Sequence, residues 1–399
     1  VYTRQGNPAW AGQKRDGTTG PIRSDDMFYP NWINLSKVAI PQADEQQHLL
    51  SNIIAKYTLD RKPLPRFWFL PKGLKAAVVM TGDDHAVAGP STVNRFNQYK
   101  SLSADNSPAG VADWNAIRGT SYIFPGTPIT DAQTSAFQAD GFEIGLHLNT
   151  NCANWTASSW QSNWTSQYAT LLGQLPSMLP QKTHRIHCIA WSDFATQPKK
   201  NVENGVRLDV NYYYFPAAWV LDRPGMFTGS GMPMRFSDVD GTLIDCYQVT
   251  TQLTDESGQT LPLHISALLD SAIGAPGYYG VFCANMHTDN NSSTSQSGSD
   301  AIVSAAQARS IPVISAKQML DWLDGRNGST FNNLVWNNNQ LSFTITAAPG
   351  SRNMKAMLPV NSSTATLNSI TYNGSSIPTT TQTIKGIVYA FFDATLGSG

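Results

Sequence analysis

The sequence has 399 residues, of which 41% are hydrophobic and 14% are charged, and its formal net charge at pH 7 is −1. Because the charged fraction is well below the roughly 25% of an average soluble protein, the polar surface has to be built from Asn, Gln, Ser and Thr, as is common in exported proteins. The sequence contains no run of Lys and Arg, which argues against a nucleic-acid partner. It also contains no long apolar stretch of the kind that spans a membrane.

The first 74 residues are irregular and rich in Pro, Gly and Trp, with one helical stretch at residues 42–57. Proline and glycine at this density interrupt regular elements. We therefore expect residues 1–74 to form an arm that packs on the main domain.

Short apolar runs alternate with amphipathic stretches between residues 75 and 327. The predicted strands cover residues 76–81, 121–124, 143–148, 184–190, 207–214, 242–249, 279–286 and 313–315. The predicted helices cover residues 92–102, 131–139, 159–179, 261–273, 300–309 and 317–323. Strands that alternate with helices pair in parallel. Seven or eight such strands favour an α/β fold with a distorted (β/α) barrel of about seven strands over a doubly wound sheet.

Residues 328–399 have a different pattern. Short strands are separated by Asn, Gly, Ser and Pro, and no helical periodicity remains. These predicted strands cover residues 334–336, 340–345, 354–358, 370–372 and 388–392. Their length and spacing indicate a small antiparallel β-module that resembles a sandwich.

The clearest chemical signal is the segment Thr81-Gly82-Asp83-Asp84-His85, where an apolar run ends in two carboxylates and an imidazole. Polar groups at the carboxyl end of a barrel strand lie at the mouth of the active site. Two adjacent carboxylates repel each other unless a cation or a proton neutralises one of them. A solvated turn also contains such pairs, so the prediction of a site depends on residues further along the chain.

Three more histidines lie at or near the ends of predicted strands, namely His147, His187 and His287. Each of them alone is typical of a hydrogen-bonded loop or core histidine. With His85, however, four of the seven histidines in the chain fall at strand ends, which a barrel brings together. A metal site at the mouth of the barrel explains this pattern.

These segments resemble the motifs of the polysaccharide deacetylases of carbohydrate esterase family 4. Residues 81–85 resemble the first motif, T-F-D-D-G, and residues 147–151 resemble the second, H-[ST]-x-x-H. Residues 185–188 loosely resemble the third, an Arg-led strand, and Met286-His287 resembles the fifth. The resemblance implies a secreted hydrolase that uses a divalent ion, zinc above all, to remove acetyl groups from a polysaccharide.

The resemblance also implies catalytic roles. Asp83 corresponds to the general base, which Arg185 holds ionised, and His287 corresponds to the general acid. The fourth motif supplies a carboxylate that tunes this acid, and by chain order it falls on Asp209, with Asp193 as the rival. A divalent ion lowers the pKa of its bound water towards about 7, and a histidine is a suitable acid for an amine leaving group near neutral pH.

The metal ligands implied by the resemblance are Asp84, His147 and a third residue. The position of the third ligand is occupied by Asn151, where the family has histidine. A neutral amide oxygen is a weaker zinc ligand than imidazole, so His187 is the alternative. His85 stands where the family has glycine, and we expect it to narrow the groove.

The four cysteines are too widely spaced for a zinc knuckle or a Cys-x-x-Cys redox site. Cys152 follows the second motif and Cys188 lies in the third, so neighbouring strand ends can bring their Cα atoms to the separation of about 5.5 Å that a disulfide needs. Metal ligation by either one is the alternative. Cys246 and Cys283 either form a second disulfide or remain buried thiols. Disulfides indicate an oxidising compartment.

Aromatic residues are frequent near the predicted mouth, and we take Trp191 and Tyr213 as candidates for stacking on a sugar, although core positions suit both equally well. The Gly-rich residues 224–235 form either a lid over the substrate or a long connection. Arg235, at their end, is a third candidate for substrate binding. No Gly-Lys-Ser/Thr follows, so this segment is not a phosphate loop.

Other functions are compatible with parts of the pattern. A glycoside hydrolase needs two carboxylates that flank a sugar bond, which Asp255 and Glu256, or Asp83 and Asp209, would supply, but that function leaves the histidines unexplained. A non-catalytic carbohydrate-binding protein with a degenerate metal site would follow from Asn151. The resemblance favours removal of N-acetyl groups from amino-sugar polymers, and an esterase that acts on O-acetyl groups would use the same site.

Overall fold

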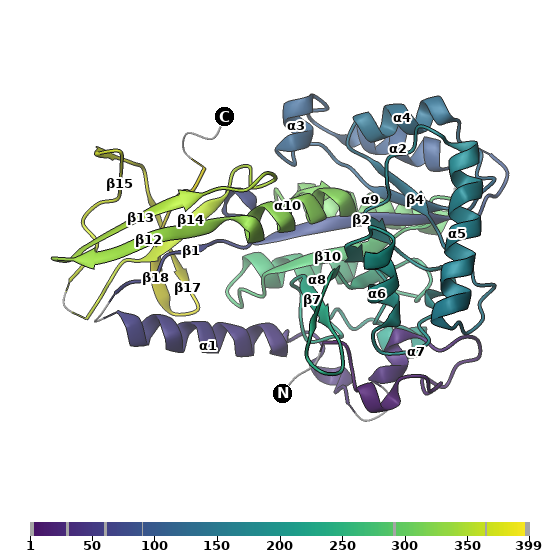
Figure 1. Ribbon diagram of the computed structural model, residues 1–399, viewed down its shortest axis with the longest axis horizontal. Helices are drawn as coiled ribbons and strands as arrows, with labels where there is room; N and C mark the ends of the chain where they lie inside the picture. Colours follow the sequence, from purple (N-terminus) through teal and green to yellow (C-terminus); the bar gives the residue numbers. More distant parts are fainter. Residues whose placement is uncertain are drawn as a thin grey trace. The chain divides into compact units, whose positions relative to one another are not determined.

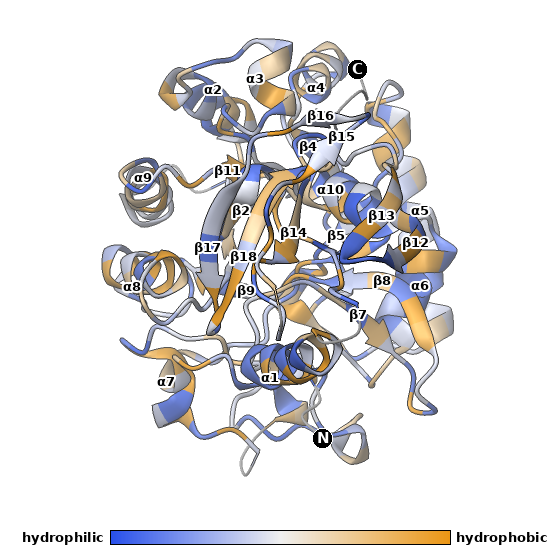
Figure 2. Cartoon of the chain, turned by 90° about the vertical axis from the view of Figure 1, so that its left-hand side faces the viewer, coloured by the Kyte–Doolittle hydropathy of each residue, from blue (hydrophilic) through white to orange (hydrophobic). Residues whose placement is uncertain are grey.

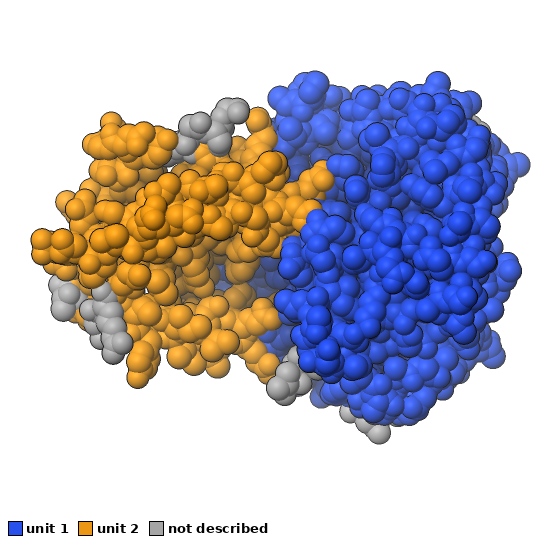
Figure 3. All heavy atoms as spheres, in the orientation of Figure 1, with its two compact units in different colours: residues 1–43, 76–320 blue, residues 44–75, 321–399 orange. Residues whose placement is uncertain are grey.

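The computed structural model describes residues 4–28, 32–59, 62–89, 91–289, 293–363 and 365–395. The chain divides into two compact units, which Figure 3 shows in different colours. The first unit contains residues 1–43 and 76–320, and the second contains residues 44–75 and 321–399. The predicted arm is therefore split, because residues 44–75 group with the C-terminal segment.

A parallel sheet of six strands forms the centre of the first unit (Figure 1). The strands follow the order β4-β3-β2-β10-β9, and β11 also pairs with β2. Their bounds are Ala76–Asp84 for β2, Thr120–Ile123 for β3, Glu143–Leu146 for β4, Thr251–Thr254 for β9, Gly280–Asn285 for β10 and Val313–Ile314 for β11. All nine residues of β2 are buried, as expected of a parallel strand that is covered on both faces.

A second sheet in the same unit has the order β5-β6-β8-β7. The strands are β5 (Thr183–His184), β6 (Leu208–Asp209), β7 (Met234–Ser237) and β8 (Leu243–Gln248). Two single bridges, Leu148 to Ile186 and Tyr212 to Thr251, connect residues that follow or belong to strands of the two sheets. Within the described residues, the strands do not form the one closed sheet of a barrel.

The short strands of the second sheet explain why the predicted barrel is not closed. The strand predicted at residues 184–190 ends at His184, because His187–Ile189 form a 3-10 turn in which Cys188 has a φ of 57°. The strand predicted at residues 207–214 is reduced to Leu208–Asp209. Ladders of two residues leave single bridges where longer strands would have formed a continuous barrel wall.

Helices follow most strands of the first unit. They are α2 (Ser91–Leu102), α3 (Pro108–Ala112), α4 (Asp131–Ala139), α5 (Ala157–Gln174), α6 (Thr196–Glu203), α7 (Ala217–Val220), α8 (Leu261–Ile273), α9 (Ser293–Gln307) and α10 (Ala316–Gly328), the last of which continues into the second unit. Thr130 begins α4 with a capping box, in which its hydroxyl accepts from the Gln133 N–H and the Gln133 side chain accepts in return. No helix in the described ranges has the length and hydrophobicity of a membrane span.

The side chains of β2 point alternately to two faces of the sheet, and the main hydrophobic core lies on one of these faces. Ala76, Val78 and Met80 belong to the main hydrophobic core, together with residues of α2, α4, α5, α8 and α9. Successive side chains of a strand point to opposite faces. Thr81 and Asp83 therefore lie on the face opposite to this core.

The second unit contains α1 (Gln42–Thr58) from residue 44 onward and a four-stranded antiparallel sheet of order β1-β14-β18-β17. The sheet strands are β1 (Arg66–Phe67), β14 (Lys355–Pro359), β17 (Thr380–Ile384) and β18 (Ile387–Asp393). Strand β1 pairs with β14, which is why residues 44–75 group with the C-terminal segment. Figure 2 shows the apolar β18 beside the polar β17.

Two hairpins complete this unit, β12 (Thr330–Asn337) with β13 (Gln340–Thr346) and β15 (Thr371–Tyr372) with β16 (Ser375–Ser376). In β12 and β13, half-buried residues alternate with exposed ones and none of them is fully buried. A sandwich would bury one whole face of the hairpin. The antiparallel strands are thus present, but the described residues do not form the predicted sandwich.

Candidate functional site

Polar side chains gather where the parallel strands of the first unit end. His85 follows β2, His147 follows β4, Arg185 and His187 follow β5, and His287 follows β10. The carboxyl ends of parallel strands lie on the same edge of a sheet, which is where such folds place their active sites. The predicted convergence of these strand ends is therefore present in the structure.

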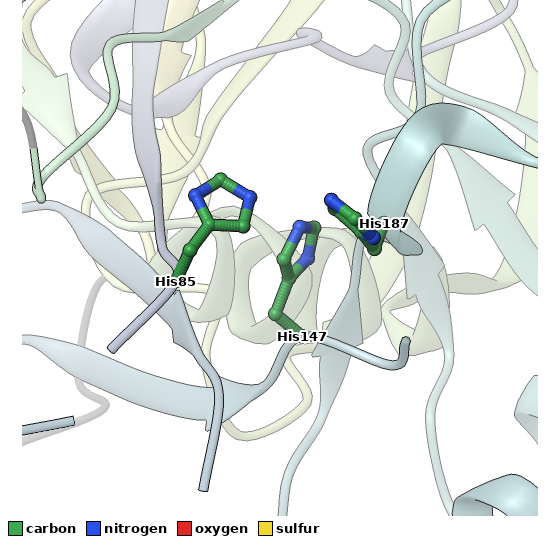
Figure 4. A group of neighbouring side chains, drawn as sticks. All are labelled: His85, His147 and His187. Carbon is green, nitrogen blue, oxygen red and sulfur yellow. The ribbon is translucent and has the colours of Figure 1, made fainter. Parts of the chain in front are cut away.

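Three of the histidines form one compact group. The ligand nitrogens of His85, His147 and His187 all lie within 4.8 Å of one another, and the ring centroids are 5.0 to 5.3 Å apart. Figure 4 shows the three rings turned toward a common space. The Phe124 ring packs against all three imidazoles and forms an apolar wall beside them.

A protein acceptor contacts the Nδ1 atom of each histidine in the group. His85 Nδ1 lies 2.7 Å from Asp289 Oδ2, His147 Nδ1 lies 3.1 Å from the Arg185 carbonyl oxygen, and His187 Nδ1 lies 3.1 Å from Asn149 Oδ1. These acceptors place the proton on Nδ1 and leave Nε2 with a free lone pair. Metal-binding histidines in proteins are oriented in the same way.

The pKa values differ within the group. Burial lowers the pKa of His147 to about 3 and that of His187 to about 4. Burial also lowers the pKa of His85, but the hydrogen bond to Asp289 and the nearby carboxylate charges outweigh it, so the net shift is upward. Neutral imidazole is the form that binds a metal. Three imidazoles are a donor set that fits zinc better than magnesium or calcium.

Asp83 is held by a buried cation. Arg185 Nη1 donates to Asp83 Oδ1 at 3.1 Å, and Asn285 Nδ2 donates to Oδ2 at 2.9 Å. Burial raises the pKa of Asp83, but the Arg185 guanidinium and the neighbouring histidines outweigh burial and hold the pKa well below its usual range. The predicted pairing of Arg185 with Asp83 is confirmed, and Asp83 is an ionised carboxylate 3.9 Å from His147 Nδ1.

His287 has a different environment. Its Nδ1 atom lies 2.8 Å from Asp255 Oδ1, and its backbone N–H donates to Asp255 Oδ2 at 2.9 Å. Burial lowers the pKa of His287, but Asp255, Asp83 and Glu256 together raise it to about 10. His287 is therefore a protonated imidazole that stacks on His85 with a centroid distance of 5.4 Å.

The carboxylate that contacts His287 is Asp255, not Asp209 or Asp193. Asp209 is buried and accepts hydrogen bonds from Asn201 and Asn211, and burial raises its pKa to about 6. Asp193 accepts from backbone N–H groups at the start of α6. The sequence signal for Asp255 was its position directly after β9, which is short, polar and absent from the predicted strands.

Two of the predicted ligands lie outside the histidine group. Asp84 accepts from the Thr92 hydroxyl at 2.6 Å, the Ala86 N–H at 3.0 Å and the Thr127 hydroxyl at 3.4 Å. As the last residue of β2 it points to the face opposite to Asp83, which explains why it does not join the group. Asn151 is exposed, and its backbone N–H donates to Asn149 Oδ1 at 2.7 Å.

The residues predicted to bind the substrate also lie elsewhere. Trp191 is 1% exposed and Tyr213 is 0% exposed, and both pack in a second hydrophobic core, so neither ring is accessible to a sugar. Arg235 in β7 forms an ion pair of 3.2 Å with Asp245 and lies over the Tyr247 ring. The buried backbone of Tyr212 accepts from the Ser24 hydroxyl, which shows how the N-terminal segment covers this region.

The predicted disulfide between Cys152 and Cys188 is present, with a Cα separation of 5.3 Å. It lies beside His187, because Cys188 is the next residue. The disulfide occupies both sulfur atoms, which therefore do not act as thiolate ligands. Cys246 and Cys283 are buried free thiols, so a second disulfide is not formed.

A comparison with solved structures matches the chain to two deacetylases. One is the polysaccharide deacetylase Bc1974 from Bacillus cereus, with 10% identity, a TM-score of 0.33 and coverage of 60% of this chain and 91% of the other. The second is the catalytic domain of a peptidoglycan N-acetylglucosamine deacetylase from Eubacterium rectale, with 9% identity, a TM-score of 0.32 and coverage of 60% and 88%. No family model matches the chain, and no curated protein matches it.

Proposed function

We propose that the protein is a metal-dependent hydrolase that removes acetyl groups from a polysaccharide. The observation that carries this proposal is the meeting of three unlike parts at one edge of the parallel sheet. These are the group of three histidines, the ionised Asp83 and the protonated His287. A glycoside hydrolase would need the carboxylates but not the histidine group.

The histidine group of this chain would hold the metal through Nε2 of His85, His147 and His187. This set replaces the ligands Asp84 and Asn151 that the sequence resemblance implies. With these residues holding it, a zinc ion would supply Lewis acidity toward the acetyl carbonyl and the attacking water. The contacts from Asp289, the Arg185 carbonyl and Asn149 keep the three rings in place for this role.

Asp83 and His287 move the protons in the proposed reaction. Asp83 takes one proton from the attacking water, whose oxygen bonds to the acetyl carbon. His287 gives its Nε2 proton to the leaving atom as the bond to the acetyl carbon breaks, so that acetate and the free sugar group are released. Arg185 keeps Asp83 ionised, and Asp255 keeps His287 protonated and oriented.

The disulfide supports an extracellular location. The bond between Cys152 and Cys188 forms and persists in oxidising compartments. We therefore propose that the protein acts outside the cytosol, where acetylated polysaccharides of cell surfaces and matrices are accessible to it.

Acetate release and metal content test the proposal together. We expect the purified protein to contain zinc and to release acetate from an acetylated polysaccharide. A chelator should abolish the release, and added zinc should restore it. Acetate release that is unaffected by complete metal removal would falsify the proposal. New reducing ends without acetate would instead identify a glycoside hydrolase.

A further inference from the structure

Glu256 is a carboxylate at the proposed site that the mechanism above does not use. It follows Asp255 after β9, and its side chain is 49% exposed, whereas that of Asp255 is 5% exposed. Glu256 Oε1 lies 3.8 Å from His287 Nε2. Asp255 and Glu256 therefore face the two nitrogens of the same ring, and Glu256 is on the side from which the proton leaves.

The position of Glu256 is fixed by a buried tyrosine. The Tyr212 hydroxyl donates to Glu256 Oε2 at 3.1 Å, and it accepts from the Thr254 hydroxyl at 3.2 Å. Tyr212 is 1% exposed, so its hydroxyl is a rigid anchor. Asn285, which donates to Asp83, also contacts this hydroxyl. The Glu256 side chain thus belongs to the same hydrogen-bonded framework as Asp83.

The cation at ion-pair distance from Glu256 is shared with a second carboxylate. The nearest cation, His287, is already paired with Asp255, and the buried Arg185 is paired with Asp83. Among the described residues, no lysine or arginine forms an ion pair with Glu256. A half-exposed carboxylate that is anchored beside the proton donor and shares the His287 imidazolium with Asp255 is available to a cation that arrives with the substrate.

We propose that Glu256 selects N-acetylated amino sugars over O-acetylated sugars by stabilising the positive charge of the leaving nitrogen. This inference rests on the proposed deacetylase function. In an amide, the nitrogen takes the proton from His287 before the C–N bond breaks, so it carries a positive charge until it keeps the bonding electron pair and leaves as an amine. In an ester, the oxygen is protonated as it leaves, and the alcohol product is neutral.

The same carboxylate defines the polymers that fit the site. A partly deacetylated amino-sugar polymer carries ammonium groups, and Glu256 attracts them. A polymer rich in uronic acids carries carboxylates, and Glu256 repels them. The substrate class is therefore a neutral or cationic polymer of N-acetylated amino sugars.

A charge-only substitution tests this selection. Glu256→Gln keeps the size of the side chain and an acceptor for Tyr212 but removes the charge. Glu203→Gln is the matched control, because Glu203 is 56% exposed and pairs with Lys200 on α6. We would measure kcat/KM on an N-acetylglucosamine hexamer and on O-acetylated cellohexaose. We expect the kcat/KM of Glu256→Gln to fall about fivefold more on the amide than on the ester, with Glu203→Gln unchanged on both.

Equal losses on both substrates would overturn the proposal, because Glu256 would then support His287 in general and not the charge on nitrogen. No loss on either substrate would overturn it as well. If the wild-type protein releases acetate from no substrate, the proposed function fails, and a binding measurement still decides on Glu256.

Calorimetric binding of the glucosamine hexamer, which is cationic, gives this second readout. The wild-type protein and Glu203→Gln should bind it more tightly than the neutral cellohexaose, and Glu256→Gln should lose this preference by about fivefold. A wild-type protein without the preference, or a Glu256→Gln variant that keeps it, would contradict the role of Glu256 whatever the enzymatic result.

Discussion

The site contains histidines in two different environments. We call the group of His85, His147 and His187 the ligand side, and His287 with Asp255 the acid side. On the ligand side, the Nδ1 atom of His147 faces a neutral backbone carbonyl, and burial lowers its pKa to about 3. On the acid side, the Nδ1 atom of His287 faces Asp255, and the neighbouring carboxylates raise its pKa to about 10. Environments that separate the pKa values of like residues define which one binds a metal and which one gives a proton.

The largest expected effect follows from removing a ligand. His147→Ala should lose its bound metal and reduce acetate release by at least about a thousandfold, because the carbonyl and the water are no longer activated. Metal analysis and acetate assays would show this. His184→Ala is the matched control, because His184 is also fully buried with a pKa of about 3 but contacts Trp160, Trp164 and Asn201. A His147→Ala protein that keeps its metal would remove the basis for the ligand side.

The acid side should respond differently. Asp255→Ala should keep its metal and lose about a hundredfold in kcat, because His287 loses both its orientation and the charge that keeps it protonated. Asp245→Ala, which removes a carboxylate paired with Arg207 outside the site, is the control. Loss of metal from the Asp255 variant would show that the two sides are not separate.

A smaller effect is expected from removing Asp289, whose carboxylate contacts His85 Nδ1. Asp289→Ala should weaken zinc binding by about tenfold to a hundredfold, because the His85 ring loses its orienting acceptor. Competition with a chromogenic chelator measures this affinity. Unchanged zinc affinity in a folded Asp289→Ala protein would mean that His85 is not a ligand, and the ligand side would then contain two histidines.

The disulfide should affect stability more than chemistry. The bond closes a loop of 36 residues, so a Cys152→Ser and Cys188→Ser double variant should lose about 4 kcal/mol in the free energy of unfolding. Zinc affinity should change by less than about tenfold, because Asn149 still holds His187. Denaturant unfolding measures the first quantity and chelator competition the second. A loss of zinc affinity of more than about tenfold would show that the disulfide helps to hold the ligand side in place.

The sequence predicted the strand ends better than the direction of individual side chains. Residues 83, 147 and 287 could be recognised because each lies at the end of an apolar run, and Arg185 because its segment resembles a family motif. Asp84 and His85 are neighbours, and only the point at which β2 ends decides that Asp84 turns to Thr92 while His85 joins the other histidines. That end is set by pairing with β3 and β10, which no local pattern encodes.

The remaining differences have similar causes. Asp255 was not connected with His287 because β9, Thr-Gln-Leu-Thr, lacks the apolar run that marks the other strands. Trp191 and Tyr213 were placed on the rim because their exposure depends on a segment far away in the sequence. The Trp191 N–H donates to the Ile22 carbonyl, and Met27 and Phe28 pack in the same core.

Arg185 has two roles that are carried by different parts of the same residue. Its carbonyl accepts from His147, and its guanidinium holds Asp83. A displacement of this one residue therefore carries the ligand and the base in the same direction. His147 and Asp83 are thus tied to the same residue, and a substitution that shifts Arg185 reaches both of them.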